Sequence, residues 1–444
     1  MARGDRSAVT DRRSARPAGR TTSSGRAAVE AVWRIESARI VATLSRYTGD
    51  FALAEDLAQE ALAEALVTWP RDGVPKEPAG WLLTCGKRRA IDTFRRNATQ
   101  RDRYSTLAHE LGEGQAAAGA PAYERQDVEV LADPDRVDDD VLALMLIACH
   151  PVVSREASVA LTLRVVGGLT SDEIARAFLV PAATVQARIT RAKKAIAAER
   201  VAFEVPEPGE RRERLGRLLS VIYLIFTEGS SATAGDDVIR HDLAREGIRL
   251  ARVLTRLMPD EAEAYGLLAL LELTAARFPA RVDEAGDPVL LEDQDRRRWD
   301  TAAVRRGRAA LVAAQRVGRG LGPYGLQAAI AECHDIAPTA EATDWSRIVV
   351  LYDGLLALTP SPVVAVNRAV AVSMADGPAA ALPLVDELIA AEALPHSHLL
   401  PLVRGELLRR LGRADEARVE LATAVERCPS VRERQLLEAR RDAL

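Results

Sequence analysis

The sequence predicts an all-α protein, and three observations support this prediction. Aromatic residues make up only 4% of the chain, whereas alanine, leucine and arginine, which favour helices, are abundant. Apolar residues recur at helical spacing through most of the sequence. The breaks fall at turn-forming segments rich in proline and glycine, such as WPRDGVPKEP (69–78) and VPEPGE (205–210). A chain of 444 residues should hold two to four domains.

The expected domain boundaries follow from these breaks. Residues 1–27 form a basic tail that we expect to be disordered, and residues 28–98 form a first helical domain. The segment 99–140 is predicted to be a flexible acidic linker. Residues 141–204 form a second helical domain, and residues 205–444 are predicted to be one long array of helices.

Charge, cysteine content and hydropathy limit the possible classes of protein. A net charge of -4 argues against a simple nucleic-acid coat protein. The four cysteines are far apart and form no C-x-x-C pair, which favours a reducing cytoplasm over a disulfide framework. The two Cys-His dipeptides (149–150 and 333–334) lack the spacing of metal ligands, so we expect buried thiols and no metal. No apolar run approaches the roughly 20 residues that span a bilayer, and no export signal is evident at the start.

The stretch DFALAEDLAQEALAEALVTW (50–69) is predicted to be a helix with two distinct sides. Leucine and alanine are expected along its buried side, at Leu53, Leu57, Ala61 and Leu62. An acidic stripe recurs every four residues on another side, at Asp56, Glu60 and Glu64. Such a stripe could bind a basic protein surface.

The next helix, WLLTCGKRRAIDTFRRN (81–97), is strongly basic. Its cations are opposed only by Asp92, and they are Lys87, Arg88, Arg89, Arg95 and Arg96. This helix could lie on DNA, although two surface helices paired through their charges would also explain the pattern. Trp81 and Phe94 occupy apolar positions, and we expect both in the core.

The stretch GGLTSDEIARAFLVPAATVQARITRAKKAI (167–196) is typical of a helix-turn-helix. Either Thr170 or Ser171 can cap its first helix, and Val180-Pro181 separates the two helices. In the second helix the residues expected inside are Val185, Ile189 and Ala192. Thr184, Gln186, Arg188 and Arg191 are expected at the exposed face, where an arginine could contact guanine, while Lys193 and Lys194 suit phosphates. An ordinary helical hairpin with a basic face is the alternative.

In this order, the motifs resemble an extracytoplasmic-function (ECF) sigma factor of bacterial RNA polymerase. The motifs are A-E-D-L-x-Q-E, then R-R-A-I-D-x-x-R-R, then G-G-L-T-x-x-E-I-A-R-A-F-L-V. Further stretches, including YLIFTEG (223–229), LLEDQDRRRWD (290–300) and GPYGLQAAIAECH (322–334), look like the sigma group that carries a long C-terminal extension similar to tetratricopeptide (TPR) repeats.

The resemblance implies a function and specific roles. Sigma factors bind core RNA polymerase through its β′ and β subunits, direct it to promoter DNA and are not enzymes. Sigma region 2 would bind polymerase through Asp56, Gln59 and Glu60. The same region would read the minus-ten element through Lys87, Arg88, Arg89, Arg95 and Arg96, although many other sigma factors carry asparagine where this chain has Arg88. Region 4 would read the minus-thirty-five element through Thr184, Gln186, Arg188, Arg191, Lys193 and Lys194. The acidic linker would enter the RNA exit path or serve as a solvated spacer.

The C-terminal half contains a repeated pattern of helix, glycine turn and alanine-rich helix. Gly377 and Gly412 are 35 residues apart, close to the roughly 34-residue period of TPR repeats. We therefore expect a TPR-like array that regulates or supports the sigma function and offers a surface to a protein or peptide regulator. The charged segment 290–300 is either a buried network or a solvated turn.

Two other classes of function can be weighed from the sequence. A helix-turn-helix activator or repressor with a TPR-like sensor domain would explain the second domain and the repeats, but not the acidic and basic helices of the first. An enzyme is not expected, because the sequence has no glycine-rich phosphate loop, nucleophile motif or metal cluster. No cofactor is predicted.

Overall fold

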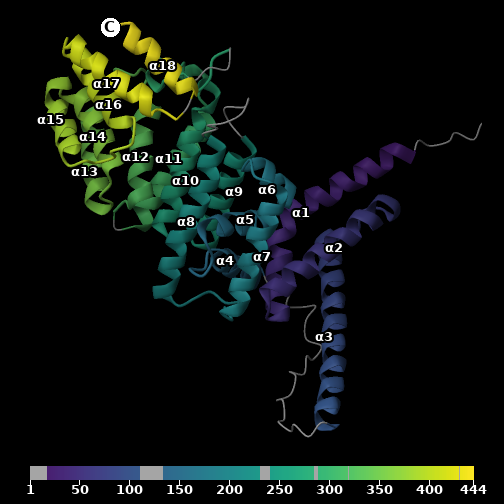
Figure 1. Ribbon diagram of the computed structural model, residues 1–444. Coiled ribbons are helices and arrows are strands. Elements are labelled where there is room, and N and C mark those ends of the chain that lie inside the picture. The colour runs from purple at the N-terminus through teal and green to yellow at the C-terminus, as the bar shows by residue number, and fades with distance from the viewer. Residues whose placement is uncertain (1–17, 111–133, 231–240, 285–288, 319, 430) are drawn as a thin grey trace, which may run out of the picture. The chain divides into compact units, whose positions relative to one another are not determined.

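The computed structural model describes residues 18–110, 134–230, 241–284, 289–318, 320–429 and 431–444. All of the regular elements in these residues are helices, which confirms the all-α prediction (Figure 1). Contacts divide the described chain into two compact units. The first unit extends to Ile174 and resumes over Ala183–Glu207, and the second comprises Ala175–Ala182 and the residues from Pro208 onwards.

The first three helices of the first unit are α1 (Ala18–Thr48), α2 (Phe51–Asp72) and α3 (Pro78–Glu110). Helix α1 packs against both of the others, and Val29, Ile40 and Leu44 have no exposed surface. The carboxylate of Asp50 starts α2 by accepting a hydrogen bond from the Leu53 N–H at 3.0 Å.

Four boundaries in this part of the chain differ from the prediction. Helix α1 begins at Ala18, so residues 18–27 are helical where a disordered tail was predicted. Helix α4 (Pro134–Ala148) begins inside the predicted linker and makes residues 134–140 helical. Helix α2 continues through Pro70 to Asp72, so the turn-rich segment begins later than expected. Helix α3 extends to Glu110, which makes residues 99–110 helical where a flexible linker was predicted. This stretch has neither proline nor glycine to stop the helix. The rest of the predicted linker up to 133, like residues 1–17 of the predicted tail, lies outside the described residues.

The remaining helices of this part are α4 (Pro134–Ala148), α5 (Arg155–Val165), α6 (Ser171–Ala177) and α7 (Ala182–Ala198). Every residue of α4 from Val141 to Ala148 is buried, and α4 packs against α1 and α5. Gly168 follows α5 with a left-handed φ of 67°. A Cβ at Gly168 would lie 2.7 Å from Ser37 Oγ of α1, so only glycine allows this close approach.

The second unit is a succession of helices, each packed on its neighbours in the sequence. They are α8 (Pro208–Ser230), α9 (His241–Leu257), α10 (Ala262–Ala276), α11 (Thr301–Val317), α12 (Pro323–Ile336), α13 (Trp345–Leu358), α14 (Pro362–Ala375), α15 (Pro378–Ala390), α16 (Leu399–Arg410), α17 (Ala414–Arg427) and α18 (Val431–Asp442). The apolar run of α8 that includes Leu218, Ile222 and Phe226 is buried, and α8 packs on α9 and α10.

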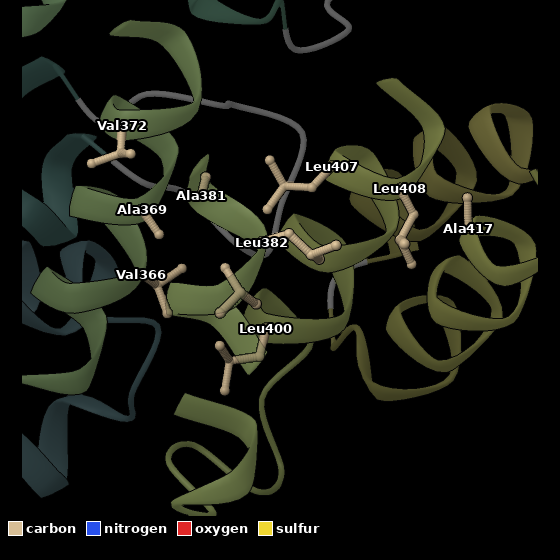
Figure 2. Close-up of a cluster of buried hydrophobic side chains, with 10 residues drawn as sticks. Val366, Ala369, Val372, Ala381, Leu382, Leu400, Leu407, Leu408 and Ala417 are labelled. Atoms are coloured by element: carbon tan, nitrogen blue, oxygen red, sulfur yellow. The ribbon is translucent and has the colours of Figure 1, made fainter. Parts of the chain in front are cut away.

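The C-terminal helices form the predicted TPR-like array. Gly377 and Gly412 have left-handed φ angles of 93° and 76°, and each lies in the turn that joins two successive helices. Apolar side chains from four helices, α14 to α17, meet in one cluster that includes Val366, Leu382 and Leu408 (Figure 2). Because each helix buries its apolar face on its sequence neighbours, the array is built from local contacts.

Helices α10 and α12 approach each other through glycines. A Cβ added at Gly266 would lie 2.7 Å from the backbone nitrogen of Gly325. The two backbones are therefore in direct contact at this crossing, beside the Glu263 carboxylate.

The charged segment 290–300 forms a network inside the second unit. It contains two short 3-10 helices, Leu291–Asp293 and Arg296–Arg298. The guanidinium of Arg296 lies over the buried Trp299 ring at 4.7 Å and donates hydrogen bonds to the carbonyls of His334 and Ala337. Arg297 remains exposed and pairs with Asp295. The sequence left open whether this segment is a buried network or a solvated turn. Arg296 and Trp299 belong to a network, whereas Arg297 is part of a solvated turn.

The four cysteines are free and buried, which confirms the burial predicted for Cys149 and Cys333. None of the described helices combines the length and apolar character that crossing a membrane requires.

Candidate functional site

The acidic stripe of α2 is exposed but not free of partners. The side chains of Asp56 and Glu60 are 65% and 55% exposed, and that of Glu64 is 38% exposed. Arg89 of α3 donates hydrogen bonds to Glu60 at 2.7 Å and to Glu64 at 2.8 Å. These bonds, led by the one to Glu64, raise the pKa of Arg89 although burial alone would lower it. Two carboxylates of the stripe are therefore held by a basic side chain of the same domain.

The buried side of α2 only partly matches the predicted one. Leu57 and Ala61 are buried as expected, whereas Leu53 and Leu62 are half-buried. Alanines at positions 54, 58 and 65 are buried as well, because small side chains let α2 lie close to its neighbours. Gln59 is half-buried, and its Nε2 atom has no hydrogen-bond partner in the part of the chain that the structure describes.

The predicted minus-ten residues of α3 fall into two groups. Arg88, Arg95 and Arg96 are exposed, so a nucleic acid can reach them. Lys87 and Arg89 are half-buried, with the Lys87 ammonium 5.1 Å from the centre of the Tyr47 ring.

Trp81 and Phe94, both expected in the core, are half-buried. The Trp81 ring packs edge-on against buried Trp69, with 5.6 Å between the ring centres. Trp81 therefore packs against the core with part of its ring, as predicted, and the rest of the ring stays accessible to solvent.

A capping box starts the first helix of the helix-turn-helix. The hydroxyl of Thr170 accepts a hydrogen bond from the Glu173 N–H at 3.2 Å, and the Glu173 carboxylate accepts one from the Thr170 N–H at 2.8 Å. Thr170 rather than Ser171 is therefore the cap. Burial alone would raise the pKa of Glu173, but the Thr170 hydrogen bonds and Arg34 of α1 lower it.

Helix α7 has the two predicted faces. Val185, Ile189 and Ala192 are buried, which confirms the inward positions. Among the candidate DNA contacts, Gln186, Arg191 and Lys194 are exposed, and Thr184, Arg188 and Lys193 are half-buried. Leu179 in the turn before α7 adopts a left-handed φ of 51°.

Lys193 joins the two domains of the first unit. Its ammonium lies 2.8 Å from Glu55 Oε2 and 2.5 Å from Asp56 Oδ1. Burial would lower the pKa of Lys193, but the carboxylates of Glu55 and Asp56 outweigh it and raise the pKa. The structure thus brings a candidate polymerase contact and a candidate phosphate contact into one ion pair.

Sequence reasoning did not identify Glu55 or its second partner, Arg164. The Glu55 side chain is 5% exposed, and Arg164 of α5 donates to it at 3.2 Å. One signal was present: Glu55 lies between Ala54 and Leu57 on the apolar side of α2, where an unpaired acid would be costly. Its partners, more than 100 positions away, left no pattern in the sequence.

One group in the second unit has the residue types of a metal site, which the sequence did not predict. Ligand atoms of His398, Cys428 and Glu433 all lie within 4.8 Å of one another. The His398 and Glu433 side chains are 3.2 Å apart and share a hydrogen bond. That bond ties α18 to the start of α16, and the Arg434 guanidinium on the Cys428 carbonyl ties α18 to the end of α17.

Three family models match the chain in succession. Sigma-70 region 2 matches residues 34–100, and sigma-70 region 4 matches residues 143–196. Residues 214–315 match a family of unknown function, DUF6596. The chain therefore carries sigma-70 region 2 on α1 to α3 and sigma-70 region 4 on α4 to α7.

Two relatives and one solved structure are similar to the chain. An uncharacterized protein of Rhizobium meliloti (strain 1021) is 42% identical over 394 residues, which cover 86% of this chain and 88% of the relative. A probable ECF RNA polymerase sigma factor of Mycobacterium tuberculosis, SigI, is 31% identical over 188 residues, 41% of this chain and 59% of SigI. The crystal structure of yeast Tom70 aligns with 88% of this chain and 80% of its own, at 12% identity and a TM-score of 0.35.

Proposed function

The chain belongs to the same family as the rhizobial protein, and we propose that it is an ECF-type sigma factor that directs core RNA polymerase to promoters. The observation that carries this proposal is the order of its domains: sigma-70 region 2 precedes sigma-70 region 4, and each presents exposed basic side chains on a helix. A sigma factor works in the cytoplasm, where its polymerase and DNA are found, and it catalyses no reaction of its own.

The polymerase contact in this proposal is the α2 acidic stripe. Asp56 and Glu60 expose more than half of their side chains, and a carboxylate at the surface can exchange one cationic partner for another at little cost. Gln59 lies between them in the sequence, and its buried Nε2 atom has no hydrogen-bond partner among the described residues. The basic surface that pairs with this stripe would be the β′ subunit.

The DNA contacts in this proposal come from α3 and α7. On α3 we assign the minus-ten contacts to Arg88, Arg95 and Arg96, and their exposure supports this assignment. Arg89 is held by Glu60 and Glu64, so we assign it the role of positioning the stripe as well as any DNA contact. On α7, Gln186 and Arg191 are exposed for the minus-thirty-five element, with Arg188 and Thr184 half-buried beside them.

The second unit supports the sigma function in this proposal, and the chain falls in the sigma group with a long TPR-like extension. Its helices bury their apolar faces on one another and form an ordered array. The outer surface of such an array is suited to binding polymerase or a protein or peptide regulator. Run-off transcription with the intact chain and with residues 1–204 separates support from inhibition. We expect the shorter chain to be folded by circular dichroism and inactive, and higher activity would assign the second unit an inhibitory role.

The direct test of the function is run-off transcription from genomic fragments with purified core polymerase. We expect promoter-specific transcripts that depend on the chain. Replacing both Asp56 and Glu60 with arginine should abolish co-purification with core polymerase and leave the helical content unchanged. A wild-type chain that binds promoter DNA but never core polymerase would overturn the proposal and favour a helix-turn-helix activator or repressor.

A further inference from the structure

Five ion pairs between described residues connect the region 2 helices to the region 4 part of the first unit. Lys193 pairs with Glu55 and Asp56, Arg164 pairs with Glu55, Arg34 pairs with Glu173, and Arg46 pairs with Asp140 at 3.3 Å. Packing accompanies the charges, because Gly168 lies directly against Ser37 and Trp33 of α1. Region 4 is therefore seated on region 2 within one compact unit.

Lys193 is the member of this contact that touches both proposed binding surfaces. Asp56, one of its partners, belongs to the stripe assigned to polymerase, and Lys193 itself is assigned to a DNA phosphate. An ammonium bound between two carboxylates cannot contact a phosphate at the same time, and Asp56 cannot give its full charge to a polymerase cation while it holds Lys193.

We propose that the ion pair of Lys193 with Glu55 and Asp56 is an autoinhibitory latch that holds region 4 against α2 and occupies Asp56, one carboxylate of the polymerase-binding stripe. The proposal rests on the sigma function proposed above. In the closed unit each interface lacks one of its charged groups, and opening releases both groups together. Binding of core polymerase at Asp56 then favours binding of DNA at Lys193, and the reverse holds to the same extent.

The charges around the latch determine how easily it opens. Arg164 of α5 belongs to region 4 as Lys193 does, so opening takes both cations from Glu55 together, and its carboxylate is then left to pair with water. Asp56 is 65% exposed, and water can solvate it as soon as the pair separates. Salt should weaken this exposed side of the latch more than the Glu55 side.

The first test compares Lys193→Ala with Lys194→Ala in the full chain, by affinity for core polymerase in the absence of DNA. Lys194 is the adjacent lysine of the same helix and is exposed, which makes it the matched control. We expect Lys193→Ala to bind core polymerase at least about fivefold more tightly than wild type and Lys194→Ala to be unchanged. Asp56→Ala opens the same latch but removes the polymerase contact, so it should not gain affinity. Unchanged or weaker binding by Lys193→Ala would overturn the latch.

The second test measures closure without polymerase, so that failure of the latch and failure of the sigma function can be told apart. Ala63 of α2 and Ala197 of α7 are exposed, and the native cysteines are buried, so Ala63→Cys and Ala197→Cys can carry a pair of distance labels. Lys193→Ala and Asp56→Ala should each lengthen the distance between the labels, and the double substitution should lengthen it little further. Unchanged distances would sink the latch whatever the polymerase result. Longer distances in a chain that never binds core polymerase would keep the latch and reject the sigma function.

Discussion

The carboxylates of α2 and those inside the second unit have opposite surroundings. Asp56 and Glu60 are more than half exposed, whereas the side chain of Glu272 is 2% exposed and that of Asp335 is fully buried. Each is near a basic side chain, yet the energetic meaning differs. An exposed pair contributes little to stability and can be exchanged for a partner's charge, while a buried carboxylate that loses its partner destabilises the fold. The comparison separates acids that bind from acids that hold helices together.

Buried and half-buried acids of the second unit, Glu272 and Glu263, fix helix positions. Glu272 of α10 pairs with Arg252 of α9 and with Arg306 of α11, so one carboxylate ties three helices. Glu263 accepts hydrogen bonds from the Tyr324 and Gly325 N–H groups at 3.0 and 3.2 Å, which satisfies the first turn of α12.

The largest effect that tests this comparison is expected at Asp335. Burial, partly offset by Arg277 and Arg296, raises its pKa to about 7. A carboxyl whose pKa is higher in the folded than in the unfolded chain stabilises the fold at low pH, and this contribution is lost as the pH rises towards 7. Asp335→Asn should therefore gain stability relative to wild type between about pH 4 and 7, by up to roughly 4 kcal/mol. Urea unfolding of both chains across this range measures it, and parallel pH profiles would contradict the assignment.

Glu263→Ala should destabilise the second unit by about 2–3 kcal/mol, because two N–H groups at the start of α12 lose their acceptor. Glu263→Gln keeps an amide oxygen in place and should lose no more than half as much. Hydrogen exchange at the Tyr324 and Gly325 amides locates the effect. If the alanine and glutamine variants unfold alike, the carboxylate is not acting as the cap.

On the first unit, Arg188→Ala should reduce discrimination at one base pair of the minus-thirty-five element by about 1–3 kcal/mol. Lys194→Ala should instead weaken binding to all promoters similarly and reduce the salt dependence. A promoter library read with holoenzyme measures both. Identical profiles for the two variants would mean that the division into base and phosphate contacts is wrong.

The smallest effect on stability is expected at Arg89, whose pairs with Glu60 and Glu64 are partly exposed. Arg89→Ala should cost less than about 1 kcal/mol and weaken core polymerase binding by at most about fivefold, through looser placement of Glu60. Arg95→Ala, on the exposed part of α3, should leave core binding unchanged and weaken promoter binding. The reverse pattern would identify Arg89 as a direct DNA contact.

The fold class could be predicted because its signals are local. Helical periodicity, the Thr170 cap with Glu173 three residues later, and the turn glycines Gly377 and Gly412 depend on neighbours within a few positions. The end of α3 was missed for a related reason, since charge and low hydropathy after residue 98 suggested a linker although nothing there stops a helix.

The partners of the candidate residues could not be predicted in the same way. Lys193 and Asp56 are 137 positions apart, and Arg164 and Glu55 are 109 apart. In the sequence each of these residues is one more charge on a helix, and only the fold of the first unit decides which of them meet. The exposure of single side chains could not be predicted from the sequence either. Lys193 and Lys194 are adjacent in the same basic run, but of these two only Lys194 is exposed.

The glycine crossing of α10 and α12 has a mechanical consequence for the second unit. Backbones in direct contact at Gly266 and Gly325 cannot slide past each other as helices cushioned by flexible side chains can, because any axial shift drives the neighbouring side chains into the opposite main chain. The crossing is therefore a stiff joint. When a force acts on the array, we expect movement at the helix contacts that are made through side chains. Helices α10 and α12 should then move together as one rigid pair.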